Sequence, residues 1–242
     1  MKGSTYIRYE VLRTFRNRRF LIFSLVFPLV LFFSIAGSNR HAHLLGIPFP
    51  LYYMTGMAAW GTMIAVVSGG ARIANERSIG WTRQMRVTPL PTRAYFGAKI
   101  LSSYLLALLS IAALSLAGTS LGVRLSTSEW LTMIGLILVG LIPLAALGIL
   151  LGHLLTVDSI GPAIGGSTSL LALLGGAYGP IFSSGVLLRL VKGLPSYWLV
   201  QAGKTALGGA GWPAEGWIVI AAWSVVLTLI ATRVYRRDTA RL

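Results

Sequence analysis

The chain of 242 residues contains no cysteine and little charge. Without cysteine it can form no disulfide, thiolate metal site or cysteine nucleophile. Only 11% of the residues are charged, whereas a soluble domain carries about 25% because its surface needs them. Hydrophobic residues make up 55% of the chain. The composition therefore excludes a soluble protein and predicts an integral membrane protein.

Acidic residues are the scarcest charged type, with 6 Asp and Glu against 21 Lys and Arg. In a soluble protein the net charge of +15 would suggest nucleic-acid binding, but in a membrane protein it more often reports topology. All the acids lie outside the long apolar runs, which disfavours ion coupling through a carboxylate at the bilayer midplane. Coupling through backbone carbonyls stays open. The acids are Glu10, Glu76, Glu129, Asp158, Glu215 and Asp238.

Six apolar runs approach or exceed the roughly 18 residues needed to cross a bilayer. None of them contains Asp, Glu, Lys or Arg. They predict an all-α membrane protein in which residues 20–242 form one transmembrane domain. The predicted spans are 20–37, 51–71, 100–121, 131–152, 160–177 and 217–232.

The basic residues are concentrated on one side of these spans. Residues 1–19, 72–99 and 233–242 hold six, six and four of the 21 Lys and Arg residues. Cytoplasmic segments carry such an excess. Both termini and the 72–99 segment are therefore predicted to be cytoplasmic.

Three segments outside the spans are predicted to be structured. In residues 1–19, Ile7, Val11, Leu12 and Phe15 form an apolar stripe in a basic helix that suits the inner leaflet surface. The outer segment 177–213 contains an apolar stretch, 180–191, that is too short to cross and predicts a re-entrant or interfacial helical hairpin. The aromatic residues at 197 and 198 then lie at the level of an aromatic belt.

The third segment, residues 75–93, is cytoplasmic, basic and amphipathic. A helix is expected from Asn75 to Val87, because Thr88 precedes Pro89 and is thereby disfavoured in the α conformation. One interpretation is a solvated connector held at lipid headgroups. The other is a rigid rod that docks on a cytosolic partner.

No catalytic or metal site is predicted. Gly203, Lys204 and Thr205 match the end of a P-loop, but the motif also needs glycine at 198, where this chain has tryptophan. An ATPase site within the chain is therefore rejected. His41 and His43 have no nearby acid, so they do not predict a metal site.

Taken in order, these segments resemble a permease subunit of the ABC-2 class of ATP-binding-cassette exporters, of the daunorubicin and multidrug type. That family has an amphipathic helix before span 1, a coupling helix between spans 2 and 3, and short outer helices between spans 5 and 6. Trp81 separates a glycine from a threonine that are adjacent in the family motif. The coupling motif is matched by Glu76-Arg77, Gly80, Thr82, Arg83 and Val87-Thr88-Pro89-Leu90, and the outer motif by Leu194-Pro195 and Tyr197-Trp198-Leu199.

The resemblance implies partners for this chain. Two copies of a cytosolic ATPase subunit would bind ATP and Mg, a second permease chain (identical or similar) would complete the pathway, and no cofactor would bind to this chain. The chain itself would be no enzyme and would lie, surrounded by membrane lipid, in a bacterial cell membrane. The residues expected to couple it to the ATPase are Glu76, Arg77, Gly80, Thr82, Arg83, Arg86, Thr88 and Pro89.

The resemblance alone implies export, and the apolar, uncharged spans favour an amphiphilic or hydrophobic substrate, such as a drug, an antibiotic or a lipid-like molecule. For each aromatic candidate, core packing or lipid contact is the alternative. The alternatives for the whole chain are an ion-coupled secondary transporter or channel without an ATPase, and a non-transporting scaffold. The candidate pathway residues are Phe27, Phe32, Tyr52, Tyr53, Trp60, Tyr104 and Tyr178.

Overall fold

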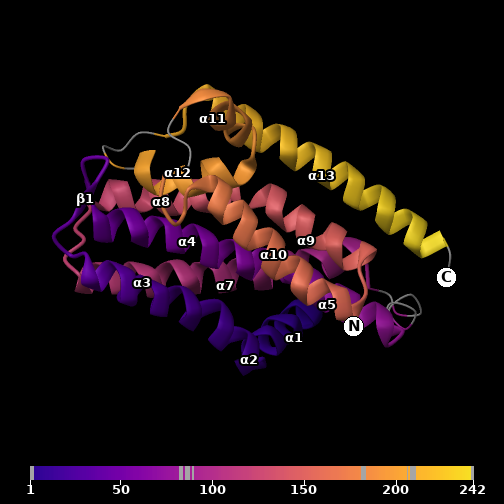
Figure 1. Cartoon of the computed structure of the whole chain (residues 1–242). Helices are drawn as coiled ribbons and strands as arrows, with labels where there is room; N and C mark the ends of the chain where they lie inside the picture. Colours follow the sequence, from indigo (N-terminus) through magenta and orange to yellow (C-terminus); the bar gives the residue numbers. More distant parts are fainter. Residues whose placement is uncertain are drawn as a thin grey trace.

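The computed structural model describes residues 3–81, 84, 88, 90–180, 184–205, 207 and 211–240 and shows an elongated helical bundle (Figure 1). A two-stranded antiparallel hairpin, in which His43 pairs with Pro48, leads from the first helices into the centre of the bundle. The elements of this first part are α1 (Gly3–Arg16), α2 (Arg18–Leu21), the π-helical turn η1 (Ile22–Val26), α3 (Phe27–Ser38), β1 (His43–Leu44), β2 (Ile47–Pro48), α4 (Phe49–Val67) and α5 (Gly69–Ser78).

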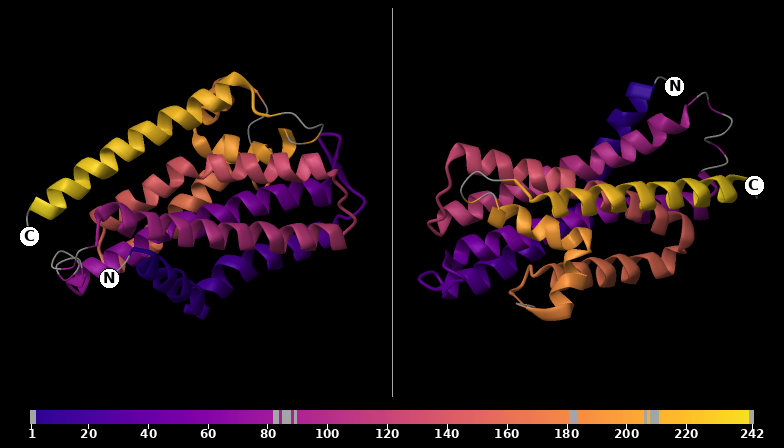
Figure 2. Two further views of the ribbon diagram at one scale, coloured as in Figure 1. Left: turned by 180° about the vertical axis from the view of Figure 1, so that it is seen from behind. Right: turned by 90° about the horizontal axis from the view of Figure 1, so that it is seen from above.

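The second part contains the longest helices. Helix α13 runs along the edge of the bundle from the α11–α12 end to the end at which the N-terminus lies (Figures 1 and 2). The elements are α7 (Thr92–Ser120), α8 (Thr127–Gly140), α9 (Ile142–Leu154), α10 (Val157–Gly175), α11 (Gly185–Lys192), α12 (Pro195–Thr205) and α13 (Ala214–Ala240).

The predicted all-α membrane architecture is confirmed, although the number of spans is confirmed only in part. Within the described residues, five helical stretches are long and apolar enough to cross a membrane. The first predicted span corresponds to η1 and α3, where the apolar helix Ser24–Ser38 is shorter than the other five, so a sixth span stays a prediction. The five stretches are Phe49–Ser78, Thr92–Ser120, Thr127–Leu154, Val157–Gly175 and Ala214–Asp238.

Helix α4 is the centre of the bundle. Every residue from Pro50 to Val67 is buried, and the helix packs against α3, α7, α9, α10 and α12. A helix that is apolar on all sides is stable only when neighbours or lipid surround it. In α4–α5, 89% of the most apolar window is buried inside the protein, against 22% in α10 and 17% in α13. The apolar surfaces of α10 and α13 therefore face outward.

The helices are longer and more often interrupted than the apolar runs predict. Two of the predicted spans, 51–71 and 131–152, are each divided into two helices that break at Ser68 and Leu141. Pro143 lies at the start of α9, where its missing N–H is tolerated. The run 217–232 is only the apolar part of α13. Hydropathy marks the membrane-facing part of a helix and not its polar ends.

Three of the six acids begin helices. Glu129 and Ser126 form a capping box at the start of α8, and Asp158 and Glu215 lie in the first turns of α10 and α13. A carboxylate there is stabilised by the free N–H groups and the positive end of the helix dipole. The other three acids have a different use, described below.

The first helix packs on the bundle through a polar face, and contact of its apolar stripe with the inner leaflet stays a prediction. Among the described side chains of α1, Tyr6, Glu10 and Thr14 are buried, one turn apart, whereas Leu12 of the stripe is exposed. Helix α1 packs against α7 through this polar face. Hydropathy alone could not show this face, because its polar groups are buried only by pairing with groups on other helices.

The predicted helix over 75–87 is also corrected at its start. Residues 75–78 are the last turn of α5, which ends at Ser78. Gly80 has φ +72°, a left-handed conformation that ends helices and that glycine adopts without strain. Residues Thr82, Arg83, Arg86 and Pro89 lie outside the described residues.

In the outer segment, α11 and α12 are two short consecutive helices, as a hairpin requires, and their depth relative to a membrane stays a prediction. Trp198 does not lie in an aromatic belt, because only 4% of it is exposed. Its indole N–H donates a hydrogen bond to the Lys192 carbonyl oxygen at 2.7 Å. Trp198 therefore holds α12 against the end of α11.

Candidate functional site

The last turn of α5 is held by ionic contacts on two sides. Glu76 contacts helices α1 and α7, and the next residue, Arg77, contacts α9 and α13. Adjacent residues on a helix point about 100° apart, so one turn can reach both neighbours. This turn lies immediately before Gly80 and the predicted coupling segment.

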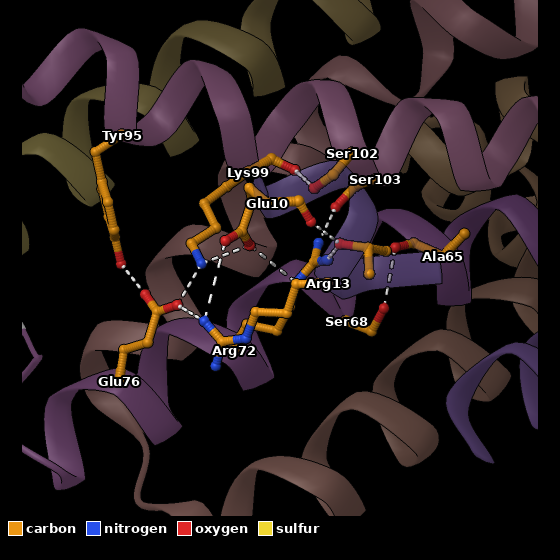
Figure 3. Close-up of polar contacts among 11 residues, drawn as sticks. Glu10, Arg13, Ala65, Ser68, Arg72, Glu76, Tyr95, Lys99, Ser102 and Ser103 are labelled. Atoms are coloured by element: carbon orange, nitrogen blue, oxygen red, sulfur yellow. Dashed lines mark hydrogen bonds and ion pairs between the residues drawn. The ribbon is translucent and has the colours of Figure 1, made fainter. Parts of the chain in front are cut away.

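Glu76 is the centre of the contacts on the first side (Figure 3). Its carboxylate oxygen Oε1 accepts hydrogen bonds from Lys99 Nζ at 2.5 Å and from Arg13 Nη1 at 2.7 Å. The other oxygen, Oε2, accepts from the Tyr95 hydroxyl at 2.7 Å. The side chain is fully buried. All of its acceptors therefore depend on α1 and α7 rather than on water.

Glu10 of α1 is the second carboxylate of this group. Lys99 Nζ donates to Glu10 Oε1 at 2.7 Å, so one ammonium group bridges both acids. Arg72 of α5 donates from Nη2 to Ser103 Oγ at 2.9 Å and contacts Thr14 of α1. We call Glu10, Arg13, Arg72, Glu76, Tyr95 and Lys99 the buried ionic cluster.

The balance of charge in the buried ionic cluster is three cations against two carboxylates. Burying an ion costs several kcal/mol, and close pairing must offset this cost. Removing one partner therefore destabilises the fold far more than replacing the whole pair by apolar residues. Burial raises the pKa of the neighbouring Tyr6 phenol, and the carboxylates of Glu10 and Glu76 raise it further. Tyr6 thus adds no negative charge.

On the second side, Arg77 holds the end of α13. Its Nε lies 2.9 Å from Asp238 Oδ2, and its Nη2 donates to Asp238 Oδ1 at 3.2 Å. Its Nη1 donates to the Gly152 carbonyl oxygen of α9 at 3.1 Å. His153 Nδ1 lies 2.9 Å from Asp238 Oδ2. We call Arg77, His153 and Asp238 the tail contact.

Aromatic rings lie beside the tail contact. Tyr235 packs edge-on against Phe96 at 5.0 Å and against His153 at 5.5 Å, measured between ring centroids. Such edge-to-face pairs add a modest attraction to the area that they bury. They join the end of α13 to α7 and α9.

Backbone contact between α5 and α9 adds to this second side. A Cβ atom added to Gly70 would overlap the Gly148 carbonyl oxygen, and one added to Gly152 would overlap the Gly70 carbonyl oxygen. Glycines at these positions let the backbones of α5 and α9 approach closely, as small residues do between membrane helices. Helices α5 and α9 are thus tightly packed at Gly148 and Gly152. The pair Gly161 and Gly165 has open space, with no described atom within 4 Å.

The helices that form this arrangement match a known family. Residues 49–233, from α4 into α13, match the sequence profile of the ABC-2 family transporter protein. The chain belongs to the ABC-2 transporter family. It is also 28% identical over 242 residues, covering 96% of each chain, to the Bacillus subtilis (strain 168) protein described as "Putative transport permease YvfS".

Membership of the ABC-2 family makes the chain a multi-pass membrane protein of transport-permease type, as the resemblance implied. The matched residues contain Glu76, Arg77 and Lys99. Their partners Glu10 and Asp238 lie outside the match, in the first helix and at the end of the last. Both termini of the chain are thus tied to the matched part through α5.

The predicted coupling residues have different surroundings. Glu76 is buried and Arg77 is paired, so neither side chain is free to reach a separate subunit without giving up these contacts. Gly80 allows the turn after α5, and Thr88 is exposed and makes a contact of its own. The structure does not test the coupling role of any of them, and the other four lie outside the described residues.

Of the seven aromatic candidates, three lie together. Trp60 of α4 packs edge-on against Phe27 and against Tyr178, each with ring centroids 5.5 Å apart.

The other four candidates have different surroundings. Tyr52 is buried, its hydroxyl donates to the Gly176 carbonyl oxygen at 3.1 Å, and the Lys204 ammonium lies over its ring. Tyr104 lies elsewhere, donating to the Leu138 carbonyl oxygen at 3.1 Å. Buried Phe32 and Tyr53 complete the set.

Sequence reasoning missed Glu10, Tyr95, Lys99, His153 and Asp238 as site residues. One signal was available: a chain with only six acids has few partners for its cations, so an acid on a basic helix suggests a specific pair.

A metal site would need several ligating side chains close together. In the described part of the chain, no three His, Cys, Asp or Glu side chains lie close enough together to hold an ion.

Proposed function

We propose that this chain is the permease subunit of an ABC exporter that moves an amphiphilic or hydrophobic molecule out of the cytoplasm. Two copies of a separate ATPase subunit hydrolyse ATP with Mg, and two permease chains enclose the pathway. Family membership supports the association with an ABC ATPase. The observation that carries the coupling route is the double attachment of the last turn of α5.

The attachment joins the predicted docking segment to most of the bundle. The residues after Ser78 follow α5 directly, and α5 is fixed to α1 and α7 by the buried ionic cluster and to α9 and α13 by the tail contact. A push on this segment is therefore passed to four helices as well as to α4. Closure of the ATPase dimer would move these helices together.

The docking surface itself is formed by exposed apolar residues at the turn. Ile79 is 63% exposed and Trp81 is 36% exposed, on either side of Gly80. Exposed aromatic and aliphatic side chains at the cytoplasmic end are suitable anchors for a groove on a partner. Glu76 and Arg77 then act behind this surface by positioning it.

For the pathway, the proposal relies on the outward faces of α3 and α10. Phe27 is 42% exposed beside Trp60 and Tyr178, so an aromatic surface reaches the outside of the bundle there. Along α10, Gly161, Gly165 and Gly166 have no described neighbour within 4 Å of a Cβ position. A second permease chain packed against these faces would enclose the aromatic group between the two copies.

The coupling route is tested with the permease copurified and reconstituted with its proposed partner ATPase subunit. Ile79→Asp should leave insertion and folding unchanged but abolish cosedimentation of the ATPase and its permease-dependent activity. Leu45→Asp is the matched control, because Leu45 is an aliphatic residue that is 70% exposed at the opposite, predicted outer end. Full coupled activity of the Ile79 variant would refute the docking surface.

The pairing of permease chains has a clean test because the chain contains no cysteine. Gly165→Cys on α10 should give a covalent dimer on mild oxidation in membranes. Val225→Cys, which is 58% exposed on α13, should give none. Cross-linking through Val225 but not through Gly165 would show that the second chain packs against α13 instead of α10, and would refute this arrangement.

Ion-coupled transport without an ATPase is the second candidate, and the buried ionic cluster is the observation that it would use. Both carboxylates there accept hydrogen bonds from cations, so neither needs a transported ion to be neutralised. Substrate movement by the purified chain alone under a proton or sodium gradient would favour this candidate over the exporter.

A further inference from the structure

A second feature lies on the face of α7 next to the buried ionic cluster, where Phe96 packs edge-on against Tyr95. Helices α7, α9 and α13 enclose a groove of about 580 Å³. Its lining is apolar along most of its length and basic at one end. We call it the tail groove. Its lining includes Arg93, Phe96, Ile100, Tyr104, Ile149 and Arg236.

The two arginines of the tail groove lie at the same level. Arg93 is near the start of α7, and Arg236 is near the end of α13. Phe96 and Tyr235, which pack with ring centroids 5.0 Å apart, bring these two helix ends together. By the distribution of basic residues this is the cytoplasmic end. Both arginines are exposed.

The apolar part of the tail groove has the length of one lipid leaflet. From Arg93 to Tyr104 the helical rise of 1.5 Å per residue gives about 16 Å. The hydrocarbon core of a bilayer is about 30 Å thick, so one leaflet contributes about 15 Å. An acyl chain lying along Ile100 and Ile149 would therefore end near the bilayer midplane when its headgroup is level with Arg93.

We propose that the tail groove binds one anionic phospholipid of the inner leaflet. Its phosphate lies between Arg93 and Arg236, and one acyl chain fills the space between α7, α9 and α13. Basic pockets between membrane helices on the cytoplasmic side suit anionic headgroups. The lipid would fill the space between the tail helix α13 and the bundle, beside the tail contact.

Charge and location favour a phospholipid over other occupants. The groove opens between membrane-spanning helices, where lipid is the solvent, and two arginines at the headgroup level select a negative headgroup. A protein helix in the same place would have to bring an acidic residue to the level of Arg93 and Arg236. This chain has few acids, and those described at its cytoplasmic end are already paired within the chain, with the exception of Asp158 at the start of α10.

The test uses the full-length permease in nanodiscs made from equal amounts of phosphatidylglycerol and phosphatidylcholine with identical acyl chains. Native mass spectrometry after release measures which lipid stays bound. The wild type should retain phosphatidylglycerol in excess, by about fivefold for each arginine that contacts the phosphate. Arg93→Gln combined with Arg236→Gln should bring the ratio of the two lipids close to one.

Two further variants separate the headgroup from the chain. Thr232→Trp fills the groove from an exposed position and should reduce retention of both lipids. Arg233→Gln removes an exposed arginine of α13 that does not line the groove, and should retain phosphatidylglycerol like the wild type. Thermal unfolding checks that all variants are folded.

Retention of both lipids in equal amounts by the wild type would overturn the proposal. So would equal lipid ratios for the double variant and Arg233→Gln. If Thr232→Trp changed the mass of the oligomer without affecting bound lipid, a second copy of the chain would occupy the groove instead. None of these measurements involves an ATPase, so they do not depend on the proposed export function.

Discussion

The two sides of α5 are held by ion pairs of different kinds. Toward α1 and α7, Glu76, Lys99 and Glu10 are at most 3% exposed. Arg13, which also contacts Glu76, is 48% exposed. Toward α9 and α13, Arg77 and Asp238 are 28% and 25% exposed. Water can reach both partners of the Arg77–Asp238 pair, but it cannot reach the contacts of Lys99 with the two carboxylates. The buried ionic cluster should therefore be permanent, whereas the tail contact can open and close.

The largest expected effect is that of Glu76→Gln. The change leaves Lys99 and Arg13 without their shared carboxylate, and breaking a buried pair costs about 3–5 kcal/mol. Thermal or denaturant unfolding of the purified permease measures the loss. Glu215→Gln, at an exposed first-turn position of α13, is the control and should change stability little. Equal stability of the two variants would contradict a permanent cluster.

The second effect in size is that of Tyr95→Phe, which removes one hydrogen bond to the buried Glu76 carboxylate but keeps the ring. Hydrogen bonds to charged groups contribute about 1.5–3 kcal/mol. The loss should be smaller than that of Glu76→Gln and should disappear when both changes are combined. A double-mutant cycle of unfolding free energies measures this coupling. Additive losses would mean that the two groups do not share one interaction.

Gly70→Ala tests whether backbone packing, rather than the tail contact, holds α5 on its second side. The added methyl group would meet the Gly148 carbonyl oxygen of α9, and overpacking of this kind costs about 1–3 kcal/mol. Gly161→Ala is the control, because it has open space in α10 and alanine favours helix. Unfolding of both variants separates steric overlap from helix propensity. A stable Gly70 variant would show that α5 and α9 are not in tight contact.

The smallest stability effect is expected for Arg77→Gln. Partly exposed ion pairs contribute about 0–1 kcal/mol, and salt screens them. The variant should unfold like the wild type but make the end of α13 more accessible to proteases. The accessibility of the wild type should rise with salt, and that of the variant should not change. A large loss of stability would show that the two sides of α5 are alike.

Much of the fold could be predicted from the sequence alone. The predictions that failed concern features that depend on contacts or turns rather than on hydropathy. Five of the six apolar runs lie in helices that are long and apolar enough to cross a membrane, because suitability for lipid depends on local hydropathy. The end of α5 at Ser78 depended on the left-handed turn at Gly80, which an apolar pattern does not encode. The polar face of α1 was missed, because Glu10 and Thr14 are buried by partners on other helices. Trp198 was predicted at the membrane surface but is buried in the core of the bundle.

The sequence by itself determined that this chain belongs in a membrane, because hydropathy and charge content are properties of composition. Its distribution of Lys and Arg predicts which end faces the cytoplasm. Only the tertiary structure decided how the few acids are used. Glu10 meets Lys99 across 89 positions of sequence, and Arg77 meets Asp238 across 161. Which charges pair depends on which helices pack together, and that is settled by contacts such as that of Gly70 with Gly148, which involve no charged group.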